Sequence, residues 1–108
     1  ALNETGNAGG ALELLNRIRT RVNLPSVNIS EKAALRNAIL KERRLELAFE
    51  GIRWFDLKRT GTAIEVMNNA IDHTGNKIGY NLTENRLLWP IPQAEIDKNS
   101  KLTQNDGY

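Results

Sequence analysis

Apolar residues recur at helical spacing in the first part of the chain. Four of them fall on one face of a helix predicted over about residues 11–22: Ala11, Leu15, Ile18 and Val22. Pro25 ends this helix, because proline disfavours helical geometry in the residue before it. The glycine-containing run Gly6–Gly10 predicts a turn ahead of it.

A second, longer helix is predicted from about residue 31 to residue 49 or 50, with Ser30 as its N-cap and Gly51 as its break. Its apolar stripe is formed by Leu35, Ala38, Ile39 and Phe49, with Leu45 at the edge. Glu42 and Glu46 fall on the same stripe. A carboxylate in an apolar stripe needs a partner, so each is expected to be paired.

The rest of the chain predicts shorter elements. Two short helices, a polar loop or short hairpin, and an extended segment are expected over about residues 53–59, 62–71, 72–81 and 85–92. The last is extended because Pro90 and Pro92 restrict the residues before them, and Pro92 can open a final short helix. This order favours an all-α fold, with helix hairpins packed as at the end of an α-solenoid.

Length and composition limit the possibilities further. The chain has 108 residues, which suits a single domain over residues 1–108. Its first residues, ALNET, are typical of a helix end without its beginning, so we expect a segment of a longer protein. The absence of cysteine excludes disulfides, thiolate metal sites and cysteine nucleophiles. No apolar run approaches transmembrane length, and no signal peptide is visible.

Charges of both signs interleave in the segment from Lys41 to Arg59, which contains EGIRWFDLKR. It holds six basic and four acidic residues, whereas the rest of the chain holds nine of each sign. A nucleic-acid surface is normally enriched in one sign, so this pattern argues against nucleic acid as a partner. The short basic run of Arg17, Arg19 and Arg21 is interpreted as a solvated helix face.

The carboxylates of this segment are the chain's candidates for acid–base catalysis, for example on a glycoside. Each has a basic residue at helical distance; Glu42, for instance, lies within reach of Arg36 and Arg43. An arginine partner lowers the pKa of a carboxylate and makes it a poor general acid. The single histidine, His73, has no carboxylate or serine pattern around it. No catalytic, cofactor or metal site is therefore predicted.

We interpret the charged segment as structural. Its residues form a predicted ion-pair network that consists of Glu42, Arg43, Glu46, Glu50, Arg53, Asp56 and Arg59. Trp54, Phe55 and Leu57 are expected to bury against the long helix, and the network would fix how the chain folds back after Gly51. Buried pairs of this kind specify one geometry more than they add stability.

Three stretches, in this order, resemble the SusD/RagB family of bacterial outer-membrane nutrient-binding lipoproteins. They are ALNETGNAGGALELLNRIRTRVNLP (Ala1–Pro25), ILKERRLELAFEGIRWFDLKRTG (Ile39–Gly61) and LLWPIPQAEIDKNSKLTQNDGY (Leu87–Tyr108). The middle stretch resembles the signature of the family, and the last resembles its C-terminal ending. Two departures are visible: Asp106 stands where the family pattern has proline, and Ile52 where it often has histidine.

The resemblance implies the C-terminal part of a SusD-like α-helical superhelix with tetratricopeptide-like helix pairs, ending in an irregular proline-containing segment. It also implies a surface-exposed lipoprotein in the outer membrane of a Bacteroidetes-type bacterium, whose lipid anchor would lie outside this chain. The implied partner is a SusC-like TonB-dependent transporter, to which a glycan or oligosaccharide, or sometimes a peptide, is delivered. The resemblance implies neither enzyme activity nor a cofactor or metal.

Within this family, sugars are bound mostly by aromatic side chains in variable loops. Tyr80 lies in such a loop beside Asn76 and Asn81, and these three are the candidate ligand-binding residues. A loop tyrosine packed on the domain is the alternative for Tyr80. Tyr108 is a further aromatic candidate, whereas Trp89, between Leu88 and Pro90, is expected in the core.

Two roles stay open for this segment within such a protein. It can belong to the glycan-binding subunit mainly as scaffold, or it can be a structural and protein-contact segment with no ligand site of its own. Exposed apolar stripes would also allow the isolated chain to self-associate.

Overall fold

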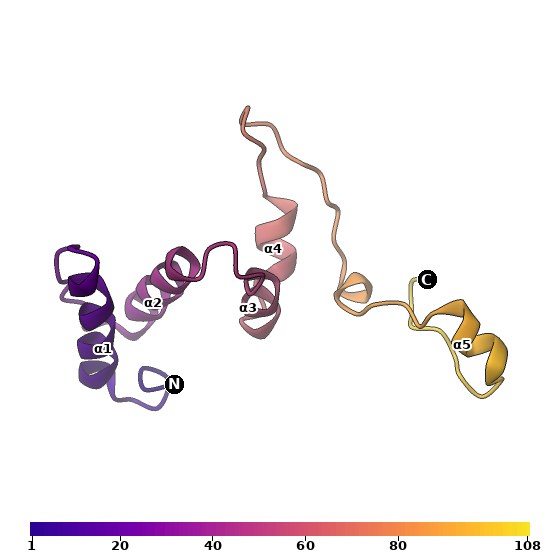
Figure 1. The fold of residues 1–108 in the computed structure, drawn as a ribbon, viewed down its shortest axis with the longest axis horizontal. Helices are drawn as coiled ribbons and strands as arrows, with labels where there is room; N and C mark the ends of the chain where they lie inside the picture. The colour runs from indigo at the N-terminus through magenta and orange to yellow at the C-terminus, as the bar shows by residue number, and fades with distance from the viewer. The chain divides into compact units, whose positions relative to one another are not determined.

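The computed structural model describes all 108 residues, as two compact units that comprise Ala1–Arg53 and Trp54–Tyr108. Its helical elements, drawn in Figure 1, are α1 (Ala8–Arg21), α2 (Lys32–Glu46), α3 (Arg53–Arg59), α4 (Ala63–Asn68), the 3-10 helix η1 (Glu84–Leu87) and α5 (Gln93–Lys98). One isolated antiparallel bridge joins Ile71 and Lys77, and no strand is formed. The prediction of an all-α chain is confirmed.

In the first unit, α1 and α2 lie side by side and share a small apolar core (Figure 1). Ala11 and Leu15 of α1 pack with Leu35 of α2, whose side chain is fully buried. Val27 and Ile29, from the segment between the helices, cover this core. The predicted apolar stripes are confirmed at these central positions.

Capping by an asparagine moves the start of α1 into the predicted turn. The side chain of Asn7 accepts the N–H of Gly10 at 2.9 Å, so α1 begins at Ala8 and the turn prediction for residues 8–10 was wrong. A Cβ added at Gly10 would lie 3.0 Å from the Asn7 amide, which favours glycine at this position.

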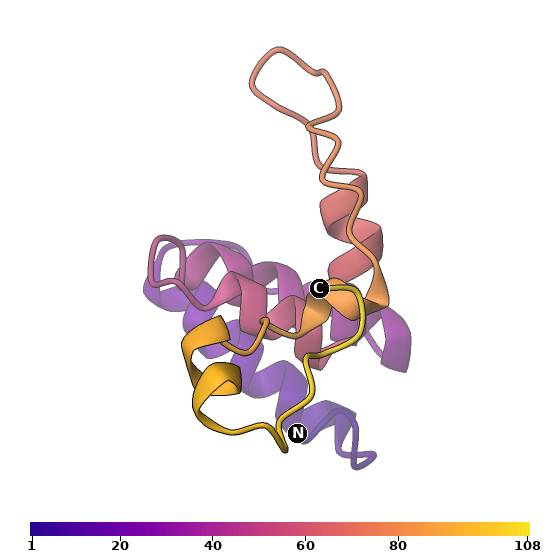
Figure 2. The same ribbon diagram turned by 90° about the vertical axis from the view of Figure 1, so that its right-hand side faces the viewer.

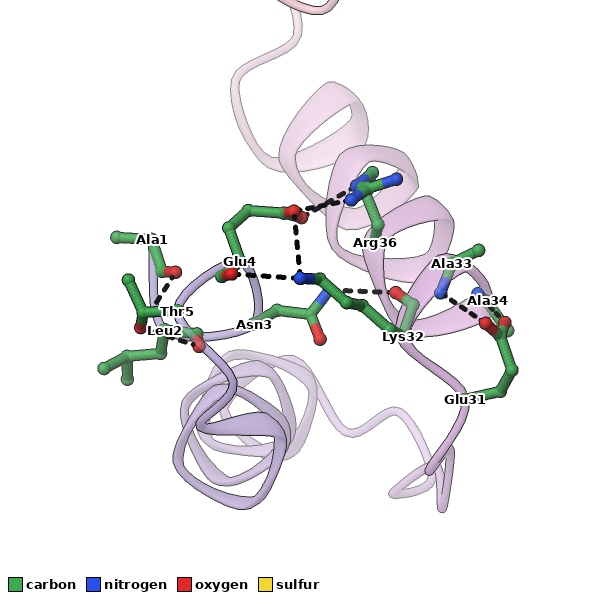
Figure 3. Close-up of polar contacts among 10 residues, drawn as sticks. All are labelled: Ala1, Leu2, Asn3, Glu4, Thr5, Glu31, Lys32, Ala33, Ala34 and Arg36. Atoms are coloured by element: carbon green, nitrogen blue, oxygen red, sulfur yellow. Dashed lines mark hydrogen bonds and ion pairs between the residues drawn. The ribbon is translucent and has the colours of Figure 1, made fainter.

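The cap of α2 is Glu31 and not Ser30 as predicted. Its carboxylate accepts the backbone N–H groups of Ala33, at 2.8 Å, and Ala34 (Figure 3). These two backbone hydrogen bonds hold the pKa of Glu31 below its ordinary value of 4.5.

The C-terminal end of α2 also differs from the prediction. The helix stops at Glu46, three residues before the predicted end at residue 49. Phe49 adopts a left-handed backbone with φ 67° and Gly51 one with φ 72°, so the chain turns away from the helix axis. Phe49 is consequently fully exposed, and its prediction as a stripe residue was wrong.

Polar contacts hold the N-terminal turn against α2 (Figure 3). The Asn3 amide donates to the carbonyl of Lys32 at 2.9 Å. The carboxylate of Glu4 accepts a bidentate pair of hydrogen bonds from Arg36, at 2.7 Å and 2.5 Å. The Lys32 ammonium donates to the backbone carbonyl of Glu4 at 3.0 Å. The Arg36 guanidinium is the main cause of a lowered pKa at Glu4.

The helix α3 has its predicted bounds, and all of it but Arg53 belongs to the second unit. It is followed by α4, which ends at Asn68 and not near residue 71 as predicted. Leu57 and Ala63 are the buried apolar side chains of the second unit. Phe55 is exposed, so its predicted burial was wrong. A long loop between α4 and η1 projects from the end of α4 in both views (Figures 1 and 2).

The proline-containing segment is extended only in its second half. Residues 84–87 form η1, so the prediction of an extended chain from residue 85 was wrong there, whereas Leu88 has extended backbone angles. Pro92 precedes α5 as predicted. None of the helices is long and apolar enough to cross a membrane.

Three side-chain amides each clamp one residue of an irregular segment by two hydrogen bonds. The amide of Asn16 donates to the Val27 carbonyl and accepts the Val27 N–H, both at 2.9 Å. The same two-way contact joins Asn68 to Leu82 and Gln104 to Ile91. An amide can act in this way because it carries both a donor and an acceptor.

Loss of one of these amides should destabilise its unit. We expect Asn16→Ala to lower the free energy of unfolding by about 1–3 kcal/mol, because the half-buried N–H and C=O of Val27 lose their partners. Urea titration followed by circular dichroism measures this. Asn28→Ala, at an exposed asparagine without side-chain hydrogen bonds, is the control and should lie within about 0.5 kcal/mol of the parent. Equal effects of the two substitutions would contradict the clamp.

The Glu31 cap predicts a dependence of stability on pH. Since the folded pKa lies below the ordinary 4.5, the contribution of Glu31 is complete above about pH 4.5 and is lost as the pH falls through the folded pKa. Glu31→Gln should therefore reduce the loss of stability between about pH 5 and pH 3. Unfolding followed at both pH values tests this, with Glu13→Gln, an exposed carboxylate on α1, as the control. An acid slope unchanged by Glu31→Gln would exclude the cap as its source.

Candidate functional site

The loop that carries the predicted ligand residues is ordered by its own side chains. One oxygen of Asp72 accepts the hydroxyl and the backbone N–H of Thr74, at 2.6 and 2.8 Å, and the N–H of Asn76 at 3.0 Å. The Thr74 hydroxyl is the largest cause of a lowered pKa at Asp72. Gly75, with φ 88°, allows the turn inside this ring of contacts.

Two of the three predicted ligand residues use their amide donors within the loop. Asn76 donates to the Thr74 hydroxyl at 2.8 Å, and Asn81 donates to the carbonyl of Gly79 at 3.1 Å. Tyr80, between them, is half-exposed with a relative accessible surface of 52%, and its hydroxyl makes no hydrogen bond. The loop therefore offers one aromatic ring and few free amide donors. The three residues line neither of the two hollows described below.

The other aromatic residues are placed differently from expectation. Trp89 was predicted in the core, but 80% of its surface is exposed, so that prediction was wrong. Its segment is held by backbone contacts, because Asn105 donates to the Trp89 carbonyl at 2.6 Å and the Tyr108 hydroxyl donates to the Leu88 carbonyl at 2.8 Å. The Arg86 guanidinium lies 4.4 Å from the ring centre of Tyr108, which covers one face of that ring.

Glu42, the first carboxylate of the predicted network, is buried and paired across the helix hairpin. Arg19 Nη1 lies 2.8 Å from its carboxylate, while Arg19 Nε donates to the carbonyl of Pro25 at 2.9 Å. Arg19 was interpreted as part of a solvated face, which was wrong. The signal that could have identified it is Glu42 itself, because a carboxylate on the stripe that faces α1 needs a cation from α1.

The remaining residues of the network divide into paired and unpaired ones. Glu46 is paired with Arg21 of α1, and Asp56 with Arg59 at 3.1 Å within α3. Neither Glu50 nor Arg53 makes an ion pair or a side-chain hydrogen bond. Arg43 lines the apolar hollow of the first unit.

This apolar hollow, of about 450 Å³, lies along α1, the second half of α2 and the N-terminal turn. Its walls are mainly apolar and include Leu14, Ile18 and Leu47. Asn3 lines it too, and its side-chain oxygen is buried without a hydrogen-bond partner. The chemistry of this surface favours an apolar occupant over a hydroxyl-rich one.

A second hollow, of about 380 Å³, lies in the second unit between η1 and the C-terminal tail. It is lined by Glu84, Asn85, Leu88 and the tail residues 103–106. All but one of these seven residues are polar. No local pattern in the sequence indicates this cleft, because its two walls are separated by about fifteen residues.

The polar groups of the chain do not form a recognisable catalytic or metal centre. No group of three His, Cys, Asp or Glu side chains is close enough to hold a metal ion. His73 is exposed on the 72–81 loop. The buried carboxylates Glu42 and Asp56 are each bound to an arginine, so each already has a partner within the chain.

The buried Arg19–Glu42 pair predicts an asymmetric response to substitution. Arg19→Met should lower the free energy of unfolding by about 3 kcal/mol, because it leaves a buried carboxylate without its cation. Arg21→Met, at the exposed pair with Glu46, should cost less than about 1 kcal/mol. Urea unfolding of both variants measures the difference, and equal values would show that Glu42 does not depend on Arg19.

The comparisons with known proteins agree with one another. The model of the SusD family matches residues 1–108. SusD-like protein P38 of Formosa agariphila is 41% identical over 117 residues, and SusD-like protein P2 of the same organism is 39% identical over 119 residues. Both alignments cover the whole of this chain, and they cover 22% and 23% of the two relatives.

Among solved structures, a SusD superfamily protein from Parabacteroides distasonis superposes with a TM-score of 0.69 at 28% identity. The match covers 98% of this chain and 24% of that protein. The chain therefore spans less than a quarter of the length of these relatives. With a match to the family model over its full length, the chain belongs to the SusD family.

Proposed function

We propose that the chain is the C-terminal segment of a cell-surface nutrient-binding protein that binds glycans or oligosaccharides and delivers them to a transporter. The observation that carries this proposal is the match of the SusD family model to all 108 residues. Family membership supports a non-catalytic lipoprotein of the outer membrane, in a Bacteroidetes-type bacterium. It supports equally a SusC-like TonB-dependent transporter as the partner that receives the ligand.

Within that protein, this segment acts mainly as scaffold. Its polar side chains are largely committed to internal contacts, such as the Asn16 clamp, the Arg19–Glu42 pair and the Asp72 turn. The Asn76 and Asn81 amides are committed in the same way. That the predicted ion-pair network also orients the chain after α2 belongs to the same proposal, through its paired members Glu42, Glu46 and Asp56.

The alternative is a structural or protein-contact segment without any ligand site. The apolar hollow of the first unit and the exposed Phe49 and Leu45 favour this reading, because such surfaces are typical of protein contacts. They also support self-association of the chain when it is studied alone.

Calorimetric titration of the full-length protein and of this chain against neutral oligosaccharides, acidic oligosaccharides and short peptides tests the proposal. We expect the full-length protein to bind at least one saccharide, and the chain alone to bind it at least about tenfold more weakly. Equal affinities would place the principal site inside this segment and contradict the scaffold role. Binding of no saccharide by the full-length protein would contradict the glycan function.

Two variants of the full-length protein extend the same titration to the loop. If Tyr80 contributes a sugar-stacking ring, Tyr80→Ala should weaken binding while Tyr80→Phe, which keeps the ring, should not. Unchanged binding by both would show a loop tyrosine without a role in the ligand site.

A further inference from the structure

The polar cleft of the second unit has the volume of a small ligand site. Its volume of about 380 Å³ lies within the range of about 300–1000 Å³ that is typical of ligand pockets. One wall is η1, with Glu84 and Asn85, and the other is the C-terminal tail, with Thr103 and Asp106. Leu88 contributes the apolar part of its surface.

Four of the six polar side chains that line this cleft are free, in contrast to those of Asp72, Thr74 and Asn76 in the 72–81 loop. Glu84, Asn85, Thr103 and Asp106 make no hydrogen bond or ion pair through their side chains. Each is exposed and is thus available to a solute. Together they present two carboxylates that accept hydrogen bonds, an amide that donates and accepts, and a hydroxyl that does both.

The frame of the cleft is held by the remaining tail residues. Gln104 is bonded in both directions to Ile91, Asn105 to the carbonyl of Trp89, and Tyr108 to the carbonyl of Leu88. The backbone of Gly107, with φ 89°, passes so close to Asn85 that an added Cβ would lie 2.9 Å from the Asn85 Cβ. The backbone of the tail wall is therefore held by contacts within the chain, which lowers the entropic cost of binding.

The charge of the cleft limits the ligand class. Glu84 and Asp106 bring two negative charges and no lining residue brings a positive one, so anionic groups are disfavoured. A metal ion would need more oxygen ligands than two carboxylates, and no cluster of three acidic or metal-binding side chains is present. Adjacent hydroxyl groups of a neutral ligand match both the carboxylates, as donors, and the Asn85 amide, as acceptors.

We propose that this cleft is an accessory subsite for a neutral, hydroxyl-rich saccharide unit, with Glu84 and Asp106 accepting hydrogen bonds from sugar hydroxyls. The proposal rests on the glycan-binding function given above. It adds the location of a subsite and a preference for uncharged over anionic sugars. Asn85 and Thr103 complete the polar ring, and Leu88 offers a contact for the C–H groups of the sugar.

Isothermal titration of the full-length protein with neutral hexasaccharides of glucose, xylose and mannose, and with trigalacturonate, tests the subsite. Glu84→Gln and Asp106→Asn should each weaken binding of the neutral saccharide by about tenfold, since hydrogen bonds to a charged acceptor are lost. Both are isosteric changes at unpaired side chains, so the melting temperature should stay that of the parent. Glu65→Gln, an exposed carboxylate on α4 outside the cleft, removes the same charge and should bind as the parent does.

The outcomes separate the two proposals. Binding of a neutral saccharide that both cleft variants leave unchanged overturns the subsite and leaves the glycan function intact. Binding of trigalacturonate alone, or a calcium dependence that both cleft variants abolish, overturns the neutral-sugar assignment. Binding of no saccharide overturns the glycan function, and the subsite with it.

Discussion

The segments without regular secondary structure depend on side-chain amides that both donate and accept a hydrogen bond. The amides of Asn16, Asn68 and Gln104 each bond to both the N–H and the C=O of one residue in such a segment. A neighbouring β-strand would satisfy these backbone groups in the same way. The chain needs such contacts because only five apolar side chains are buried: Ala11, Leu15, Leu35, Leu57 and Ala63. With so little apolar burial, the position of each long connection depends on satisfying its backbone groups.

The charged side chain of Arg19 also holds an irregular segment in place by directed hydrogen bonds. It binds the backbone carbonyl of Pro25 and the carboxylate of Glu42 at once, so one guanidinium joins α1, the interhelical segment and α2. An arginine suits this position because its rigid fork presents several donors in a plane. A lysine would supply the charge without the second, directed hydrogen bond. The first unit is thus held as much by directed polar contacts as by its core.

Elements that depend on interactions between residues close in the sequence could be predicted from it, whereas contacts between distant residues could not. Helical periodicity identified the core positions Ala11, Leu15 and Leu35, and the bounds of α3 were predicted as found. The cap of α2 was misplaced by one residue, because Ser30 is the better cap by type while the longer Glu31 side chain reaches two backbone N–H groups.

The larger errors concern partners far apart along the chain. Arg19 and Glu42 are separated by 23 residues, and Asn105 and Trp89 by 16, so neither contact leaves a signal in a local pattern. Trp89 was expected in the core because its neighbours are apolar. The contacts that position its segment act on the backbone, and they leave the indole exposed.

The second unit has two polar surfaces, the 72–81 loop and the cleft between η1 and the tail. They differ in whether their hydrogen-bonding groups are already used within the chain. Composition favours the 72–81 loop, which holds two asparagines, two glycines and one threonine and carries an aromatic ring. The side chains of Asp72, Thr74 and Asn76 nevertheless bind within the loop, and among its hydroxyls only that of Tyr80 stays free. A ligand there would have to break hydrogen bonds before it could form its own.

The cleft between η1 and the tail has the opposite property. The tail alternates between residues that bind backbone, such as Gln104 and Asn105, and a residue such as Asp106 that binds nothing within the chain. A ligand that enters this cleft therefore exchanges only water for protein contacts. The state of the hydrogen bonds, and not the composition of the segment, decides which surface is the better candidate for recognition.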